Sequence, residues 1–451
     1  MRAPARHAGE APGAPLARVP VALESLILRV ESLDDEGRGV ARGPEGKVVF
    51  VEGALTGETV EARVARRKPS YDLARTTSVL EASPGRTVPA CPHFGVCGGC
   101  ALQHADVRTQ MAAKQRGLEE SFARIGKVRA ETLLPIIYGP AWGYRNRARF
   151  SARLVRKKGG VLVGFRERRS SYVAQMDECH VVPQRVSRLI PALKALIGGL
   201  SIAERVPQVE LAVGDAATVL VFRHLLPFSD ADLERLRAFG RKHDVDPWLQ
   251  PGGPDTARPL DPASARPLFY SLPEFGVRVD FRPTEFTQVN LAVNRVLVSR
   301  AVRLLDPRPG ERVADLFCGL GNFSLPIARR GAQVMGFEGS APLVARAREN
   351  ARANGLVAQF EVVDLFKAGV DAWGPFDKML VDPPRDGAVE IVKALPAEWP
   401  RRLVYVSCDP GTLARDAGIL VHVQGFRLAA AGVVNMFPHT AHVESIALFE
   451  R

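Results

Sequence analysis

The chain has 451 residues, 46% of them hydrophobic, and its 61 lysines and arginines against 49 aspartates and glutamates give a formal net charge of +12. No apolar run approaches the roughly 18–20 residues that a membrane-spanning helix needs, so the sequence argues against a membrane protein. The basic excess favours a polyanionic partner, nucleic acid first, over the alternative that the arginines reflect a GC-rich coding bias.

The first 19 residues are broken by prolines and lack the apolar stretch of an export signal. We therefore expect a disordered tail over 1–19 and a cytoplasmic protein, in which thiols stay reduced. In that compartment the six cysteines are expected to be ligands or catalysts, not disulfides. No feature indicates a protein partner, and we expect a monomer.

Residues 20–84 contain five short runs in which apolar and polar residues alternate, separated by glycine-containing turns. This pattern predicts a small β-barrel of the oligonucleotide-binding type. Within it, the segment 63–75 places basic side chains around Tyr71, as a surface for single-stranded nucleic acid would. A solvated, charged hairpin explains the same segment equally well.

Four of the six cysteines lie in a central region, residues 85–282. Cys91, Cys97 and Cys100 have the spacing C-x5-C-x2-C, and Cys179 follows further along in D-E-C-H. Three cysteines within ten residues of a reduced protein predict a metal site, either tetrahedral zinc or an iron–sulfur cluster, and the spacing does not separate the two. Between the cysteines, residues 105–125 have helical periodicity.

Residues 144–158 predict a strand with one apolar face and one basic face, because seven basic residues and no acid alternate with apolar ones. The apolar face contains Tyr144, Ala148, Phe150, Ala152 and Leu154, and the basic face contains Arg145, Arg147, Arg149 and Arg153. Arginines at this density repel one another unless an anion is present, so the basic face is expected to contact RNA phosphates.

From residue 283 onward, strand patterns alternate with helix patterns, which predicts a parallel α/β sheet. The segment 311–330 reads as a strand, a tight turn and a helix. Polar or glycine residues stand at the carboxyl ends of four consecutive strands, where such sheets bind ligands. These residues are Gly319 and Gly321 in the turn, then Glu338, Asp364 and Asp382 after the next three strands.

The turn after the first strand of this sheet does not fit a dinucleotide, because Ser324 stands where the third glycine of G-x-G-x-x-G belongs. An adenosine carried on a sulfonium fits better, and the arrangement resembles the class I S-adenosylmethionine-dependent methyltransferases. Cys318, inside the turn, is expected to be a small packing residue.

Cys408 follows a β-branched strand and precedes a helix that is expected to start near Pro410. The helix N-terminus is expected to lower the pKa of the thiol, which favours a nucleophile over a core cysteine. A thiolate that adds to C6 of a uracil makes C5 electron-rich enough to accept a methyl group, after which a base must remove the C5 proton. His439, His442 and Glu444 are candidate bases, and a buried Glu444 would have the raised pKa required.

Together these motifs resemble the bacterial RNA uracil-5 methyltransferases. The similarity is greatest to the subgroup that has an N-terminal TRAM barrel and methylates 23S ribosomal RNA, and it spans about residues 20–451. The motifs that carry it occur in order: F-T-Q-V-N (286–290), D-L-F-C-G-L-G-N-F, F-E, D-P-P-R, S-C-D-P-G-T-L-A-R-D and H-V-E-S-I-A-L-F.

The resemblance implies roles for individual residues. The S-adenosylmethionine contacts would be Gln288, Phe317, Asn322, Glu338 and Asp364. Asp382 would lie between cofactor and base, and Phe286 would pack in the target pocket. Cys408 would be the nucleophile and Glu444 the general base. The resemblance also implies that the four central cysteines hold a 4Fe–4S cluster with a structural or RNA-positioning role.

The fold that follows from the resemblance is a class I (Rossmann-like) α/β methyltransferase domain over 283–451, an oligonucleotide-binding-like TRAM barrel over 20–84, and a central α+β iron–sulfur domain over 85–282. The barrel and the cysteines favour 23S rRNA over the T-loop uridine of tRNA as the substrate. Cytosine methylation is disfavoured because no second cysteine follows the D-P-P motif. From another class, a non-catalytic RNA-binding protein would be expected to have lost Cys408 or Glu444.

Overall fold

The computed structural model describes residues 25–367 and 369–451, so the predicted tail over 1–19 lies outside the described residues. The described chain divides into two compact units, a smaller one with residues 25–32 and 38–82 and a larger one with residues 33–37 and 83–451. No helix in the described ranges is long and apolar enough to span a membrane. The predicted domain boundary at 282/283 lies inside the larger unit.

The smaller unit is a closed five-stranded barrel with the strand order β1-β2-β3-β5-β4. Its strands are β1 (Ser25–Leu33), β2 (Gly39–Arg42), β3 (Val48–Glu52), β4 (Thr59–Arg67) and β5 (Tyr71–Glu81). Alternate residues such as Val49 and Val51 are fully buried, which is the pattern that the sequence predicted. The basic segment 63–75 forms the β4–β5 hairpin.

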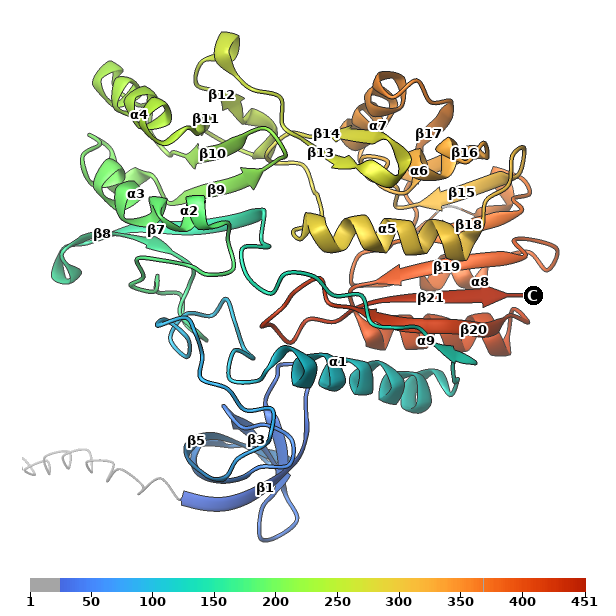
Figure 1. The fold of residues 1–451 in the computed structure, drawn as a ribbon, viewed down its shortest axis with the longest axis horizontal. Coiled ribbons are helices and arrows are strands. Elements are labelled where there is room, and N and C mark those ends of the chain that lie inside the picture. The colour runs from blue at the N-terminus through green and yellow to red at the C-terminus, as the bar shows by residue number, and fades with distance from the viewer. Residues whose placement is uncertain (1–24, 368) are drawn as a thin grey trace, which may run out of the picture. The chain divides into compact units, whose positions relative to one another are not determined.

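The central region contains a six-stranded sheet with the order β12-β11-β10-β9-β7-β8. The strands are β7 (Arg147–Val155), β8 (Gly160–Gly164), β9 (Gln208–Val213), β10 (Thr218–Arg223), β11 (Asp246–Gln250) and β12 (Arg258–Pro259). The helices α2 (Gln184–Ser187), α3 (Leu189–Gly198) and α4 (Asp230–His243) accompany it (Figure 1). Phe150 is fully buried and Arg149 is exposed, as the two-residue period of this strand predicted.

The C-terminal region contains an eight-stranded sheet with the order β17-β16-β15-β18-β19-β21-β20-β6. The strands are β6 (Thr132–Leu133), β15 (Arg312–Leu316), β16 (Gln333–Glu338), β17 (Ala358–Val362), β18 (Lys378–Val381), β19 (Arg402–Ser407), β20 (Arg427–Val434) and β21 (Glu444–Glu450). The first five strands in this order are parallel, and β21 is antiparallel to both of its neighbours. The chain turns in opposite directions from β15 and β18, so their carboxyl ends form the topological switch point where such sheets bind ligands.

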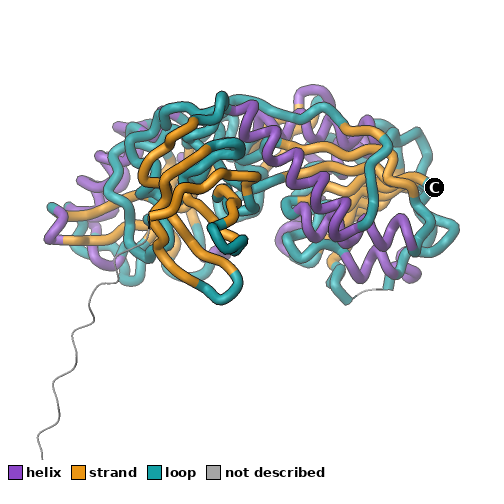
Figure 2. Tube along the Cα trace, turned by 90° about the horizontal axis from the view of Figure 1, so that it is seen from below, coloured by secondary structure: helices purple, strands orange, loops and turns teal. Residues whose placement is uncertain are grey.

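Both faces of this sheet are covered, as Figure 2 shows, because alternate residues of each strand belong to two separate cores. In β19, Val404 and Val406 pack in one core, whereas Leu403 and Tyr405 pack in the other. The first core includes α5 (Leu291–Leu305), α6 (Ser324–Arg329) and α7 (Ala341–Ala353). The second includes α1 (Val107–Ser121), α8 (Val389–Lys393) and α9 (Pro410–His422). The helix predicted over 105–125 is therefore confirmed as α1 and a following π-helical turn, Phe122–Gly126.

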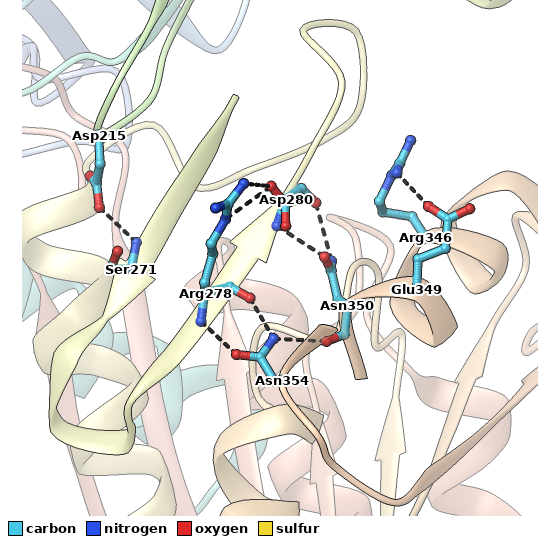
Figure 3. Close-up of polar contacts among 8 residues, drawn as sticks. All are labelled: Asp215, Ser271, Arg278, Asp280, Arg346, Glu349, Asn350 and Asn354. Atoms are coloured by element: carbon cyan, nitrogen blue, oxygen red, sulfur yellow. Dashed lines mark hydrogen bonds and ion pairs between the residues drawn. The ribbon is translucent and has the colours of Figure 1, made fainter. Parts of the chain in front are cut away.

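A two-stranded hairpin, β13 (Phe269–Leu272) and β14 (Val277–Asp280), is attached to α7 by two asparagine side chains (Figure 3). Asn354 accepts from the backbone N–H of Arg278 (2.9 Å) and donates to its carbonyl oxygen (2.7 Å). Asn350, one helical turn earlier, makes the same pair of bonds with Asp280 (3.0 and 3.1 Å). The two amides therefore satisfy the free edge of β14 as a neighbouring strand would.

Candidate active site

The turn after β15 has an unusual backbone conformation that brings main-chain groups to the sheet edge. Phe317, Gly319 and Gly321 all have positive φ angles, of 62°, 54° and 90°. The N–H of Gly319 donates to Glu338 Oε2 (3.2 Å), so the predicted turn and the predicted acid lie together. A Cβ built at Gly319 meets nothing within 4 Å, so the backbone here borders open space that a ligand could occupy.

Asn350 also supports this turn from behind. The Nδ2 that pairs with Asp280 donates as well to the carbonyl oxygen of Leu320, between the two glycines (3.1 Å). Its side chain is only 1% exposed. The amide ladder of α7 thus connects the β13–β14 hairpin with the cofactor turn, and sequence reasoning did not identify it. The available signal was the spacing of two asparagines four residues apart, which lie on one face of a helix.

A buried pair explains why serine replaces the third glycine. Ser324 Oγ donates to Asp315 Oδ2, and both residues are fully buried. Burial raises the pKa of Asp315 to about 7, while the Ser324 hydrogen bonds oppose the rise. The serine therefore supports an acid inside the sheet edge, a role that the sequence pattern did not indicate.

The remaining predicted cofactor residues have varied surroundings. Asn322 Oδ1 accepts from Tyr270 Oη and from Asn294 Nδ2, both at 2.9 Å, so its side chain is held by the hairpin and by α5. Gln288 is buried, and the Phe317 ring lies 5.7 Å from that of Phe366. Asp364 is exposed and pairs with Lys367 (2.9 Å), an ion pair that lowers the pKa of Asp364.

Cys408, Glu444 and Asp382 meet at one edge of the sheet. Cys408 follows β19 and Asp382 follows the adjacent β18, while Glu444 opens β21 on the other side. Ser407 pairs with Ser445 across β19 and β21, which puts the next position, Cys408, opposite Glu444. Cys408 is half-buried and lines a cleft of about 620 Å³ together with Arg385, His442 and Lys114, among others.

The electrostatics of Cys408 contradict the prediction that the α9 N-terminus lowers its pKa. Burial, followed by repulsion from Glu444 and Asp382, raises the pKa of Cys408 to about 11, and Arg385 opposes the rise only in part. The helix N-terminus has a competing partner, because Asp409 Oδ1 accepts from the N–H of Thr412 (2.9 Å). The predicted direction was wrong, because burial by neighbouring segments and the two nearby carboxyls dominate the pKa of this thiol.

Glu444 has the protonation behaviour that was expected of a buried carboxyl. It is 3% exposed, and burial raises its pKa well above the ordinary value, with repulsion from Asp382 as the second cause. Burial and then Asp315 raise the pKa of Asp382 to about 7. The carboxyl groups of Asp315, Asp382 and Glu444 therefore lie in a row that leads from the cofactor turn to the Cys408 thiol.

The two histidines considered as bases have other partners. His439 is 4% exposed, and burial lowers its pKa to about 4. His442 Nδ1 lies 3.3 Å from Arg385 Nη2, and burial also lowers the pKa of His442. Of the three candidates, only Glu444 has a register position directly opposite Cys408.

Three of the four arginines predicted for the basic face have hydrogen-bond partners in the protein. Arg147 donates to the backbone oxygens of Pro283 (2.9 Å) and Glu285, and Arg149 Nε donates to Glu210 Oε1 (2.8 Å). Arg153 is exposed, and Arg145 Nε donates to the carbonyl oxygen of Arg147 (3.1 Å). Arg147 thus holds the segment just before Phe286, whose side chain is 67% exposed.

The four central cysteines line one small cavity, together with His93, His180 and Phe165 among others. All four are free thiols, and burial raises the pKa of Cys100 to about 12 and that of Cys179 to about 11. Across residues 25–367 and 369–451, however, no three His, Cys, Asp or Glu side chains are arranged as a ready metal-binding group. The structure therefore gathers the cysteines without arranging them as a ligand set.

Comparisons with known proteins agree with this architecture. Residues 276–370 and 367–451 match the family described as tRNA (Uracil-5-)-methyltransferase, and residues 26–75 match the TRAM domain. The chain is 60% identical over 428 residues to the 23S rRNA (uracil(1939)-C(5))-methyltransferase RlmD of Aromatoleum aromaticum, covering 94% of this chain and 99% of that protein. It is 61% identical over 430 residues to the protein of the same name from Thiobacillus denitrificans, with the same coverage.

A solved structure has the same fold over nearly the whole length. The Pyrococcus abyssi tRNA (uracil-54, C5)-methyltransferase in complex with S-adenosyl-L-homocysteine superposes with a TM-score of 0.73 at 25% identity, covering 94% of this chain and 99% of that one. The closed barrel, the class I methyltransferase sheet and the identity to full-length relatives lead to one conclusion. The chain belongs to the RNA uracil-5 methyltransferase family, with a TRAM barrel and a class I S-adenosylmethionine-dependent methyltransferase fold.

Proposed function

We propose that this protein methylates C5 of a uridine in 23S rRNA with S-adenosylmethionine, through a transient covalent bond between Cys408 Sγ and C6 of the base. The observation that carries the proposal is the meeting of Cys408, Glu444 and Asp382 at one sheet edge, beside a cleft. Full-length relatives that are about 60% identical are named as enzymes of this activity.

The residues at the switch point fit the cofactor. The open space beside Gly319 would admit it, and Glu338 lies where an acid can accept hydrogen bonds from ribose hydroxyls. Gln288, Phe317, Gly321, Asn322, Asp364 and Asp382 complete the proposed contact set. Bound S-adenosylmethionine supplies an electrophilic methyl group.

The chain's own residues carry the covalent steps. The Cys408 thiolate adds to C6, and the electron pair of the C5=C6 bond becomes available at C5 for methylation. Glu444 then takes the C5 proton, the double bond re-forms, and the C6–S bond breaks to release Cys408 as a thiolate. Glu444 must be ionised to do this, although burial raises its pKa in the free protein.

We also propose that Cys91, Cys97, Cys100 and Cys179 hold a 4Fe–4S cluster. Four reduced thiols around one cavity are the donor set that such a cluster needs. Burial is the largest cause of the raised pKa of each of these thiols, and a bound metal would favour their thiolate forms. Finding iron and labile sulfide in anaerobically purified protein would support the cluster. Finding zinc and no iron would instead show a zinc site.

The remaining parts of the proposal concern RNA and domain limits. Arg145, Arg147, Arg149 and Arg153 would form a phosphate-binding face, with Phe286 at the target base. The barrel over 20–84, the cysteine-containing region over 85–282 and the methyltransferase domain over 283–451 are the proposed domains. Arg147 and Arg149 would have to exchange or share their present partners for RNA.

A tRNA uridine is the second candidate substrate, because the Pyrococcus abyssi tRNA enzyme superposes over 94% of this chain. This coverage removes the argument that the barrel by itself separates rRNA from tRNA enzymes. The case for 23S rRNA therefore depends on the named relatives.

The test is to trap the covalent intermediate. Incubation with S-adenosylmethionine and 5-fluorouridine-containing 23S rRNA should give a protein–RNA adduct on a denaturing gel, because fluorine at C5 cannot leave as a proton. Cys408→Ser should give no adduct while it still binds RNA. A parallel reaction with tRNA separates the two substrates, and a wild-type protein that never forms an adduct with either RNA would refute the mechanism.

A further inference from the structure

The loop 435–443 joins β20 to β21 and ends directly before Glu444. Helix α1 runs alongside β20 (Figure 1) and supplies a partner to this loop. Lys114 Nζ donates to Asn435 Oδ1 (2.8 Å) and to the carbonyl oxygen of Phe437 (2.9 Å). Tyr144 Oη donates to the carbonyl oxygen of Pro438 (3.0 Å). The segment that leads into the proposed base is therefore held from outside its own strands.

His439 is the most constrained residue of this loop. It has a left-handed backbone with φ 64°, which costs a residue other than glycine free energy and persists only where the surrounding contacts impose it. Its carbonyl oxygen accepts from the N–H groups of Ala101 (2.8 Å) and Leu102 (2.9 Å), the two residues after Cys100. Its ring stacks on Trp142 with the centroids 3.8 Å apart. The segment that follows Cys100 is thus hydrogen-bonded directly to the loop 435–443.

Gln110 connects the two segments through one side chain, which is completely buried. Its Oε1 accepts from the His439 N–H (2.8 Å), and its Nε2 lies 3.2 Å from His439 Nδ1. The same Nε2 donates to the carbonyl oxygens of Leu102 (3.1 Å) and Ala105 (2.8 Å). One amide therefore bonds both the chain after Cys100 and the chain before Glu444.

We propose that Gln110 is a positioning residue that locks the loop 435–443 to the segment 97–105, and that the order of the cysteine site thereby sets how well Glu444 is aimed at its substrate. This inference rests on the proposed function for the role of Glu444. Its structural half, the coupling of the two segments, stands on the contacts alone.

The chemistry gives the coupling a specific signature. Adduct formation and methylation use Cys408, whereas release uses Glu444 to take the C5 proton as the C6–S bond breaks. A misplaced Glu444 slows only release, so methylated RNA stays attached to the enzyme. An unfolded or RNA-binding-deficient protein would instead form less adduct.

The test compares Gln110→Met with Gln115→Met, the same substitution on the same helix at a partly exposed site whose side-chain amide donates to Glu119 Oε1 (2.8 Å). With ordinary, non-fluorinated RNA, Gln110→Met should lower kcat about ten- to hundred-fold and raise the steady-state fraction of covalent adduct. KM for RNA should fall in proportion, so that kcat/KM changes less than about two-fold, because only a step after adduct formation is slowed. Gln115→Met should match the wild type. Wild-type turnover and adduct fraction in Gln110→Met would overturn the proposal.

Two further variants keep the test decisive. Tyr144→Phe removes only the hydroxyl that bonds Pro438, and it serves as the test if Gln110→Met does not fold. It should lower kcat and raise the adduct fraction, as is expected for Gln110→Met. Cys100→Ser perturbs the cysteine site, and amide hydrogen exchange over 435–444 should rise in it as in Gln110→Met. The double variant should add no further rise, because both changes break one connection.

Hydrogen exchange over 435–444 tests the coupling of the two segments separately from the proposed methyltransferase function. If the wild type forms no covalent adduct with any uridine-containing RNA, the proposed function fails while the exchange prediction is still measured. If the wild type is active and Cys100→Ser leaves exchange over 435–444 unchanged, the coupling between the cysteine segment and the catalytic loop is refuted on its own.

Discussion

The amide ladder on α7 allows a sharp test of how the cofactor turn is supported. Replacing Asn350, which is 1% exposed, by alanine removes its bonds to the Asp280 N–H, the Asp280 carbonyl and the Leu320 carbonyl. At about 0.5–1.5 kcal/mol net for each hydrogen bond, the loss should be about 2–4 kcal/mol of unfolding free energy. Because water cannot easily reach the unpaired groups, the value should lie toward the upper end.

Asn354→Ala is the matched control, since Figure 3 shows the same ladder one turn along. The Asn354 side chain bonds the N–H and the carbonyl oxygen of Arg278 but has no hydrogen bond to the cofactor turn, and Asn354 is partly exposed. Water can replace its bonds, so the expected cost is about 1 kcal/mol. Asn350→Ala should also weaken S-adenosylmethionine binding about ten-fold, because the Leu320 carbonyl loses its partner, whereas Asn354→Ala should leave the affinity unchanged.

Urea unfolding measures the first quantity and calorimetric titration with S-adenosylmethionine the second. Equal affinities in the two variants would show that the turn holds its shape without Asn350. A larger stability loss in Asn354→Ala than in Asn350→Ala would refute the reasoning from burial.

Three further predictions follow from the electrostatics and the cysteines. Because the pKa of Cys408 is raised to about 11, the rate of adduct formation with 5-fluorouridine RNA should rise with pH from 7 to 10, up to about ten-fold per unit, and a flat profile would contradict a rate-limiting thiolate. Because the folded-state pKa of Asp315 is raised to about 7, its protonation stabilises the fold at low pH, and this contribution is lost as pH rises from about 4 through 7. In urea unfolding across that range the wild type should therefore lose up to about 1.4 kcal/mol per pH unit that Asp315→Asn does not lose, and equal slopes would contradict it. Stripping metal from the cysteine site with a chelator should lower the melting temperature by several degrees relative to untreated protein, and an unchanged value would argue against a structural cluster.

Periodicity was sufficient to predict the local elements because burial constrains every residue of a strand. The barrel strands alternate, and the strands of the large sheet are apolar on both faces, so their positions could be read from the sequence. The alternation of strands and helices also predicted that Glu338, Asp382 and Cys408, at the carboxyl ends of β16, β18 and β19, share one edge of the sheet. For the cysteines, the spacing predicted that they gather around one cavity, but not how their thiols are oriented within it.

Other features depend on contacts between residues that are far apart in the chain. Gln110 and His439 are separated by 329 positions, and nothing near either residue indicates the other. The pairing of Asn350 with the edge of β14, and the insertion of β21 between β19 and β20, likewise arise only when the elements pack. The pKa of Cys408 illustrates the physical reason. A helix start is visible in the sequence, whereas the burial and the neighbouring carboxyl groups that raise the pKa come from segments that only the tertiary structure brings together.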